Sequence, residues 1–534
     1  MYKLLFSVFL FFSFSLANAT VYYVDPVHGG LDTNIGSAGS PWGTIQHAAS
    51  TAVAGDSVFI QPGIYSEQVT FNQSGTANAF ITFEAIGNVI VKGTAAVTEW
   101  TGIFNIYNKS YLRIKNFSLQ DSYWFGIYVE SSKNIYIEND STYNTGASGI
   151  SVWHSGNVYA FNNVVRKACY QSLTTGSQEC ITFAGVIDFE IHHNEVYESG
   201  GSNNGGEGID TKDSCKNGKV YSNLIHDLIR LGIYADCWDK TLQNLEIYNN
   251  RVYKCSEGIV LSSENGGTLK NVKVYNNIIY CNNNFGITVS DYFVNGPRQN
   301  IYIMNNTIYN NGYGDGNTSW GGGIIILTSN ISNAYVFNNI VSANDAMQIS
   351  DKSGVASVSI DKNLIDGYRG YSWTYEVKGT NVIEGDPLFI DTDGNDTIAC
   401  NLDDNLDVIS SSPAINQGTN TNAPLFDFNY FARPTEVYTD IGAFEHNSMP
   451  LSVFKEFIGS SSTLIYPNPS SENSYIKIPS NVALIEVLDN RGNSFYKYEF
   501  PPEGTLKLDL PGAGLYMIKL FRENSSEVYK AIKY

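Results

Sequence analysis

The sequence is poor in charge, and particularly in positive charge. Only 16% of its 534 residues are charged, and 52 acidic residues outnumber 32 basic ones, so the formal net charge is −20 at pH 7. A chain this acidic repels nucleic acid and anionic membrane surfaces, and we expect neither as a partner. An anionic substrate would have to meet a local group of cations or a metal ion.

Cysteine is also scarce. The chain has seven cysteines, with no Cys-x-x-Cys pair and no histidine-rich metal-binding spacing. An odd number leaves at least one thiol outside any disulfide within the chain. We expect most of these thiols to be buried, and we consider Cys169 with Cys180 as the candidate bridge.

Long hydrophobic runs are absent after the first residues. Lys3 precedes an apolar run from Leu4 to Leu16, and Ala17-Asn18-Ala19 follows it, which is typical of a signal peptide over residues 1–19. The run is shorter than the ~20 residues of a membrane-spanning helix. We therefore expect a secreted or cell-surface protein with no membrane span.

Glycine and tyrosine, in contrast, are abundant, with 48 and 36 residues. This composition suits an all-β protein better than a helical one. The length allows a large core and accessory modules.

Asparagine recurs along the central part of the chain at intervals of roughly 23 to 33 residues, the range of stacked coils in a solenoid. These residues are Asn116, Asn139, Asn163, Asn194, Asn223, Asn250, Asn277, Asn306, Asn339 and Asn363. Stacked asparagine side chains at one turn position can hydrogen-bond from coil to coil, so we predict a structural role for them.

A second repeated element lies between these asparagines. It is a short period-2 strand, usually with a Gly-Ile pair near its start. Its copies are Phe125–Val129, Ser148–Val152, Glu179–Phe183, Glu207–Thr211, Leu231–Ala235, Glu257–Leu261 and Phe285–Val289. The repeats are too short for propeller blades of ~40 residues, and they predict a parallel β-helix over residues 20–370.

The start of the chain supports this fold. A strand at residues 21–26, a helical stretch within 41–54 and a strand ending in Pro62-Gly63-Ile64-Tyr65 resemble the opening of secreted, pectate-lyase-like right-handed β-helix proteins. The helix would cap the first coil, because a solenoid core is otherwise open to water at its end.

The C-terminal third has a different pattern. We predict a closing segment of the β-helix over residues 371–447 and a linker over 448–463. Residues 464–534, with Ile465-Tyr466-Pro467-Asn468-Pro469 and the final Lys530-Ala531-Ile532-Lys533-Tyr534, resemble the C-terminal sorting domain of the type IX secretion pathway of Bacteroidetes. The resemblance implies a small β-sandwich-like domain that the type IX machinery recognises and removes on export.

Period-2 alternation from each glycine predicts which side chains share the outer face of the central strands. The outward pairs are Tyr128 with Glu130, Ser151 with Trp153, Thr182 with Ala184, Asp210 with Lys212, Tyr234 with Asp236, Val260 with Ser262, and Thr288 with Ser290. We expect this face to be exposed, with Lys212 stacked on Asp236 and Asp210 beside Tyr234. Glu179, Glu207 and Glu257 would join it if the chain bends at the following residue.

Charged residues thus gather in the central coils, and aromatic residues flank them. Tyr128, Trp153, Tyr234 and Trp238 offer the flat surfaces that a sugar chain requires, and we predict that they bind substrate.

The motif Glu207-x-Ile-x-x-Lys212, with Arg230-x-Gly232 in the next coil, resembles the site of β-helix polysaccharide lyases of the alginate lyase and chondroitinase B type. The resemblance implies β-elimination on a uronate polymer, in which Glu207 binds Ca²⁺, Lys212 removes a proton and Arg230 supports the acid step. We assign Glu179 and Asp210 to the same calcium site. A desolvated Lys212 with a lowered pKa could take a proton made acidic by Ca²⁺ and Arg230.

Two alternatives stay open. A glycoside hydrolase would use two carboxylates from the set Asp210, Asp236, Glu207 and Glu257, such as Asp210 with Asp236, or would pair Asp236 with Glu257 or Glu264. A non-catalytic polysaccharide-binding protein would keep Lys212 and Asp236 as a structural ion pair. In each case we expect a monomer that contacts a polysaccharide, anionic if the lyase prediction holds.

Overall fold

The computed structural model describes residues 19–170, 179–200, 205–313 and 320–446, together with the strand residues and Leu510 between 465 and 533. The predicted signal peptide lies outside these residues except for Ala19. None of the helices within the described residues is long and apolar enough to cross a membrane.

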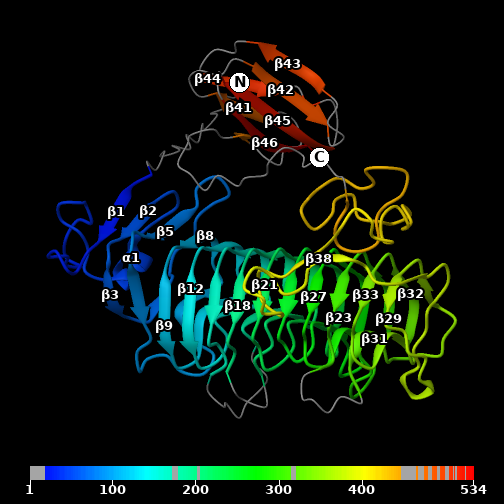
Figure 1. The fold of residues 1–534 in the computed structure, drawn as a ribbon. Helices are drawn as coiled ribbons and strands as arrows, with labels where there is room; N and C mark the ends of the chain where they lie inside the picture. The colour runs from blue at the N-terminus through cyan, green and yellow to red at the C-terminus, as the bar shows by residue number, and fades with distance from the viewer. Residues whose placement is uncertain are drawn as a thin grey trace, which may run out of the picture. The chain divides into compact units, whose positions relative to one another are not determined.

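Three parallel sheets, wound by a repeating coil, form the main body (Figure 1). Each coil from β2 to β34 contributes one strand to each sheet, which confirms the predicted all-β parallel β-helix. The first thirteen-stranded sheet contains β1 (Val21–Val24), β2 (Ser57–Ile60), β5 (Ile81–Ala85), β8 (Ser110–Lys115), β11 (Lys133–Glu138), β14 (Gly156–Phe161), β17 (Ile187–His192), β20 (Lys216–Tyr221), β23 (Thr241–Tyr248), β26 (Thr268–Tyr275), β29 (Arg298–Met304), β32 (Ile331–Phe337) and β35 (Val358–Asp361).

The eleven-stranded sheet contains β4 (Val69–Thr70), β7 (Gly102–Tyr107), β10 (Phe125–Glu130), β13 (Ile150–Trp153), β16 (Ile181–Ala184), β19 (Ile209–Lys212), β22 (Ile233–Asp236), β25 (Ile259–Ser262), β28 (Phe285–Val289), β31 (Gly322–Ile326) and β34 (Met347–Asp351). The Gly-Ile repeats of the sequence form this sheet.

The second thirteen-stranded sheet contains β3 (Gly63–Ser66), β6 (Val89–Lys92), β9 (Ser118–Ser122), β12 (Ser141–Thr145), β15 (Val164–Arg166), β18 (Glu195–Tyr197), β21 (Leu224–His226), β24 (Arg251–Tyr253), β27 (Ile278–Tyr280), β30 (Thr307–Tyr309), β33 (Ile340–Ser342), β36 (Leu364–Asp366) and β37 (Ile383–Glu384). Outside the three sheets lie α1 (Ile45–Thr51), a 3₁₀ turn (Ser372–Thr374), and the antiparallel pair β38 (Phe389–Asp391) and β39 (Asn405–Val408).

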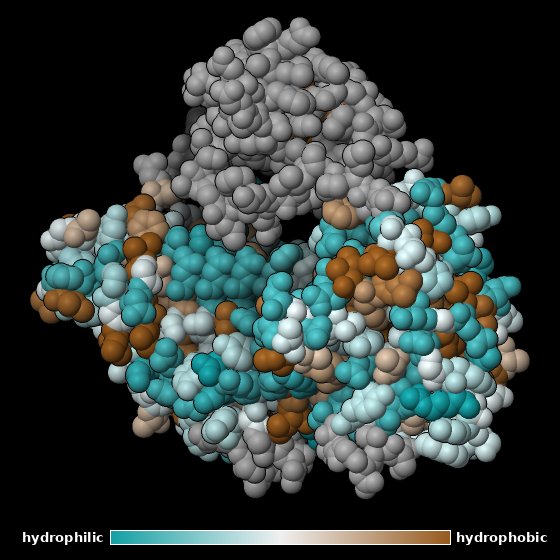
Figure 2. Space-filling model, viewed as in Figure 1, coloured by the Kyte–Doolittle hydropathy of each residue, from teal (hydrophilic) through white to brown (hydrophobic). Residues whose placement is uncertain are grey.

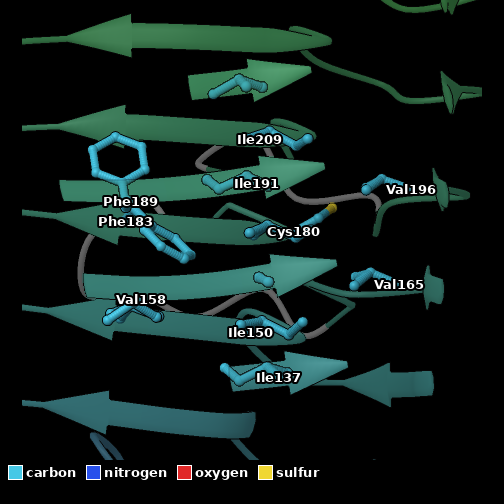
Figure 3. Packing of buried hydrophobic residues seen from close by; sticks show 14 of the residues in the cluster. Ile137, Ile150, Val158, Val165, Cys180, Phe183, Phe189, Ile191, Val196 and Ile209 are labelled. Atoms are coloured by element: carbon cyan, nitrogen blue, oxygen red, sulfur yellow. The ribbon is translucent and has the colours of Figure 1, made fainter. Parts of the chain in front are cut away.

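Inward-pointing aliphatic and aromatic side chains of the three sheets form one continuous core. Figure 3 shows part of it, where Ile150 and Ile209 of the eleven-stranded sheet face Val158, Phe189 and Ile191 of the first sheet. On the face seen in Figure 2, most of the described surface is hydrophilic and hydrophobic residues form small groups. The isoleucines that the alternation turns inward, such as Ile150 and Ile209, lie in this core.

The N-terminal cap is present as predicted. Thr44 caps α1, since its Oγ1 accepts a hydrogen bond from the backbone N–H of His47 at 3.0 Å. Ile45, Ala48 and Ala49 of the helix join the solenoid core. The helix thus covers apolar side chains of the first coils.

The asparagine ladder forms at a buried turn position. Each Nδ2 donates to the Oδ1 of the next member, at 2.9–3.0 Å, from Asn163 through Asn194, Asn223, Asn250, Asn277, Asn306 and Asn339 to Asn363. The prediction was wrong for Asn116 and Asn139, which each lie one residue before the ladder position. In their coils Phe117 and Asp140 hold that position, and Asp140 Oδ1 accepts a hydrogen bond from the N–H of Phe117. Asn139 lies one residue earlier, at a left-handed turn residue with φ 57°.

One disulfide joins Cys281, just after β27, to Cys400 of the closing segment. The predicted Cys169–Cys180 bridge is wrong: both are buried thiols, as are Cys215, Cys237 and Cys255. The sequence holds no local signal for the observed pair, because 119 residues separate its members.

The closing segment runs back along the side of the solenoid. Arg251 donates to the backbone oxygens of Leu402 and Asp404, and Asn338 donates to that of Thr419. Val408, Ala414 and Ile441 of the segment pack with Ile340 of β33 and Leu364 of β36 in one apolar cluster. The segment therefore covers several coils of the second thirteen-stranded sheet rather than only the last one.

The chain divides into two compact units: Met1–Pro424 with Tyr438–Phe444, and Leu425–Val437 with Glu445–Tyr534. The second unit contains two antiparallel sheets. One has β40 (Ile465–Tyr466), β41 (Ser474–Ile478) and β44 (Gly504–Leu508), and the other has β42 (Leu484–Asp489), β43 (Ser494–Glu499), β45 (Gly514–Arg522) and β46 (Ser525–Lys533). This agrees with the small C-terminal β-domain that was predicted.

Candidate active site

The outer face of the eleven-stranded sheet brings the predicted charged residues together. Lys212 of β19 aligns with Asp236 of β22, and Asp210 aligns with Tyr234. Both alignments confirm the prediction from the glycine spacing. Adjacent strands are ~4.8 Å apart, so these side chains are direct neighbours.

The expectation that this face is exposed was wrong. Asp210, Tyr234, Asp236 and Thr182 are all buried. A separate apolar cluster of Leu231, Tyr234, Val260 and Tyr292 packs on the outside of the sheet.

Lys212 is held by two carboxylates. Its Nζ lies 2.5 Å from Glu179 Oε1 and 3.3 Å from Asp210 Oδ2, and its side chain is 15% exposed. The other oxygen of Glu179 accepts from Thr182 Oγ1 at 2.8 Å. Glu179 therefore turns to the outer face, as the sequence pattern allowed if the chain bends before the strand.

The electrostatics of this group oppose the predicted role of Lys212 as a base. Burial acts to lower the pKa of Lys212, but the charges of Glu179 and Asp210 outweigh it and raise that pKa. The pKa of Asp210 is also raised well above its usual value, chiefly by burial. The expected lowering of the Lys212 pKa was thus wrong, because two carboxylates of the same face stabilise its charged form.

Arg230 pairs with Glu207 instead of approaching Lys212. Its Nη2 lies 2.7 Å from Glu207 Oε1, and its Nε donates to the same oxygen at 3.0 Å. Burial raises the pKa of Glu207, and the charge of Glu179 raises it further. The side chain of Arg230 is 39% exposed and lies at the edge of the group.

Asp236 has the properties of a proton donor. It is 6% exposed, and one carboxylate oxygen accepts from the N–H of Trp238 at 2.9 Å. Burial raises its pKa to about 6, and the charge of Glu264 adds to this effect, while the Trp238 N–H and Lys212 oppose it. A carboxyl group in this range can donate a proton near neutral pH.

Glu264 is the second carboxylate beside Asp236. Tyr234 donates a hydrogen bond from its hydroxyl to Glu264 Oε1. Glu264 is partly exposed, whereas Glu257 is buried and accepts from Thr288 Oγ1 and from the Tyr292 hydroxyl. Among the carboxylates that were predicted as partners for Asp236, Glu264 is thus the one that solvent reaches. It lies in the loop after β25, outside the repeated strand pattern.

The predicted substrate-binding aromatics divide into two kinds. The ring of Tyr128 is buried and stacks on Phe125 at 4.9 Å, and its hydroxyl donates to Glu130 at 2.9 Å. Tyr234 is buried as well, whereas Trp153 is partly exposed and Trp238 is exposed. Trp153 and Trp238 are therefore the two that a ligand can contact directly.

The predicted calcium site does not fit these contacts. Within the part of the chain that the structure describes, no three Asp, Glu, His or Cys side chains are placed to hold a metal ion together. Glu179 and Glu207 face Lys212 and Arg230, which already supply positive charge. Calcium stays a prediction of the sequence, and no chemical step below depends on it.

A hollow of about 350 Å³ lies elsewhere, on β20, β23 and β26 of the first thirteen-stranded sheet. It is lined by Asn217, Gly218, Lys219, Asn244, Glu246, Asn271 and Lys273. Its asparagines bond to one another along the solenoid, at 2.8 Å from Asn244 to Asn217 and 2.9 Å from Asn271 to Asn244. The residues that line this hollow include none of the predicted site residues.

Two family models match the chain. Residues 22–180 match the Pel9A-like, right-handed β-helix region, and residues 464–534 match the secretion system C-terminal sorting domain. The first match agrees with the predicted pectate-lyase-like fold. The second agrees with the predicted type IX sorting domain and indicates a secreted or cell-surface protein.

Three similar proteins show how far the resemblance extends. The uncharacterized protein YwoF of Bacillus subtilis (strain 168) is 29% identical over 61% of this chain and 75% of its own length. The structure of XylC in complex with xylose has a TM-score of 0.50 at 13% identity and covers 80% of this chain and 98% of that one. The structure of pectate lyase Pel9A has a TM-score of 0.47 at 16% identity, and the match covers 81% of this chain and 97% of that one. At 13% identity, the similarity to the XylC structure is one of fold alone.

Proposed function

We propose that the protein is a secreted or cell-surface enzyme that hydrolyses a glycosidic bond of a polysaccharide, with Asp236 as the proton donor. The observation that carries this proposal is the raised pKa of Asp236, about 6, at a position aligned with the cation Lys212. The secreted β-helix and the exposed Trp238, two residues after Asp236, support a polysaccharide as the substrate.

In this mechanism, protonated Asp236 gives its proton to the oxygen of the bond that breaks. Lys212 then stabilises the carboxylate that Asp236 becomes, because Lys212 is the aligned neighbour and stays charged. Glu264, oriented by the Tyr234 hydroxyl, serves as the second carboxylate that glycosidases require, as a base for water or as a nucleophile.

The charge balance favours hydrolysis over elimination. Lys212 and Arg230 are each matched by a buried carboxylate, and the partly exposed Glu264 adds a further acidic group. A densely anionic polymer would be repelled by this surplus, whereas a neutral or weakly charged glycan would not. We therefore favour a neutral glycan over the uronate polymer that the lyase resemblance implies.

β-Elimination with Lys212 as base is the second candidate. The exposed edge of Arg230 favours it, because a guanidinium group there can meet a substrate carboxylate. Lys212 would have to lose a proton that Glu179 and Asp210 stabilise, so elimination would become faster at high pH.

The pH dependence of kcat/KM separates the two candidates. If Asp236 acts as the acid, kcat/KM should fall as pH rises through about 6, because the proton to be donated is then lost. The measurement is a profile between pH 4 and 10 on each polysaccharide that the protein cleaves. A profile that rises through alkaline pH would instead assign the chemistry to Lys212.

A further inference from the structure

Three exposed aromatic rings gather near the C-terminal end of the solenoid. Trp320, Tyr371 and Trp373 are 40–49% exposed. Tyr371 and Trp373 stack with an interplanar angle of 11° at 5.9 Å between centroids, and Trp320 lies 6.4 Å from Trp373. Tryptophan and tyrosine side chains exposed together in this way mark a binding surface more often than scattered apolar residues do.

The segment that carries Tyr371 and Trp373 is firmly held. One oxygen of the buried Glu376 accepts from the N–H groups of Arg369 and Gly370 at 2.9 and 2.7 Å. Its other oxygen accepts from the N–H of Gln348 in β34 at 2.8 Å. Ser350 Oγ also donates to the backbone oxygen of Thr374, the residue after Trp373, at 2.5 Å. The rings are thus presented in a fixed arrangement, which lowers the entropy cost of binding.

These rings adjoin the same sheet as the candidate active site. Trp320 packs edge to face on Phe285 of β28, at 5.9 Å and 82°. Phe285 occupies the same position in its coil as Glu257 and Leu231 do in theirs. Each lies two residues before an isoleucine, and the three isoleucines, Ile287, Ile259 and Ile233, are aligned across the sheet. Since β28 is two strands beyond β22, the surface begins roughly 10 Å along the solenoid from the strand of Asp236.

A cation accompanies the rings. Lys352 Nζ lies over the ring of Trp320, 5.9 Å from its centroid. A tryptophan face next to a lysine offers both halves of sugar recognition: a flat apolar surface for the C–H face of a pyranose ring and a donor for its hydroxyl groups.

We propose that Trp320, Tyr371 and Trp373 form a glycan-binding platform that holds the polysaccharide beyond the point of cleavage. The ligand is a chain of several sugar units that lies along the solenoid from Asp236 towards its C-terminal end. The choice of substrate rests on the proposed function, but binding at the platform needs no catalysis and is tested apart from it.

The test is retention in native affinity gels that contain xylan, a β-glucan, a mannan or polygalacturonate. Trp373→Ala and Trp320→Ala are made in full-length protein that also carries Asp236→Asn, so that the polymer is not degraded. We expect each to weaken binding to the polymer that retards the parent by at least about fivefold, as central tryptophans do at interfaces. Tyr438→Ala is the matched control, because Tyr438 is 51% exposed and has Lys362 5.9 Å from its ring centroid, and it should bind as the parent does.

Three results would overturn the platform: equal retention of the tryptophan variants and the parent, an equal loss in Tyr438→Ala, or no retention of the parent by any of the four polymers. A loss of self-association in Trp373→Ala with unchanged retention would assign the surface to a second copy of the chain. If the pH profile contradicts hydrolysis while Trp373→Ala still loses binding, the platform stands and only the reaction is revised.

Discussion

Asp236→Asn should reduce kcat by about 10²–10⁴-fold, the usual contribution of a general acid. Asparagine keeps the oxygen that accepts from the Trp238 N–H but carries no proton of suitable pKa. The fold and KM should therefore change little. The measurement is steady-state kinetics on the best substrate, with the melting temperature as a check on folding.

Asp239→Asn is the matched control for this prediction. Asp239 is three residues away, and its carboxylate pairs with Lys240 at the surface. Its removal should leave kcat within about twofold, since surface ion pairs contribute little. An Asp236→Asn variant as active as the parent would remove Asp236 from the mechanism.

Lys212→Met should have the largest effect on stability. It leaves Glu179 and Asp210 buried without the cation that both contact, which typically costs about 3–5 kcal/mol. In a solenoid each coil contacts mainly its neighbours, so the loss should be local. Hydrogen exchange should become faster in β16, β19 and β22 but stay unchanged in the distant β32.

The double variant Lys212→Met with Glu179→Gln provides the control. It removes both charges of the closest pair, and we expect it to recover most of the lost protection, because replacing a buried ion pair completely is often nearly neutral. Activity should stay low in both variants, since the carboxylate of Asp236 loses its stabilising cation. Normal exchange in the single variant would mean that the Glu179–Lys212–Asp210 contacts do not stabilise these coils.

The repeat allowed the fold and the strand register to be predicted. Aligning the strands on their Gly-Ile pairs and counting every second residue predicts that Lys212 lies beside Asp236 and Asp210 beside Tyr234, as the structure shows. Alternation also placed Ile209 and Ile233 in the core. These predictions succeeded because they depend on local geometry that every coil repeats.

Features that depend on contacts between loops could not be predicted in this way. The apolar cluster on the outer face includes Leu231 and Tyr292, which lie outside the strands. The raised pKa of Lys212 comes from Glu179, which is 33 residues earlier in the chain. The partnership of Glu264 with Tyr234 and the disulfide of Cys281 with Cys400 likewise join segments that no period relates.

Product analysis in ¹⁸O-labelled water tests the central claim most directly. Hydrolysis with Asp236 as the acid incorporates one oxygen from water for each bond broken, so mass spectrometry should find one ¹⁸O in each product pair and no unsaturated sugar. Unsaturated, ultraviolet-absorbing products without ¹⁸O would contradict the account and assign the reaction to elimination by Lys212.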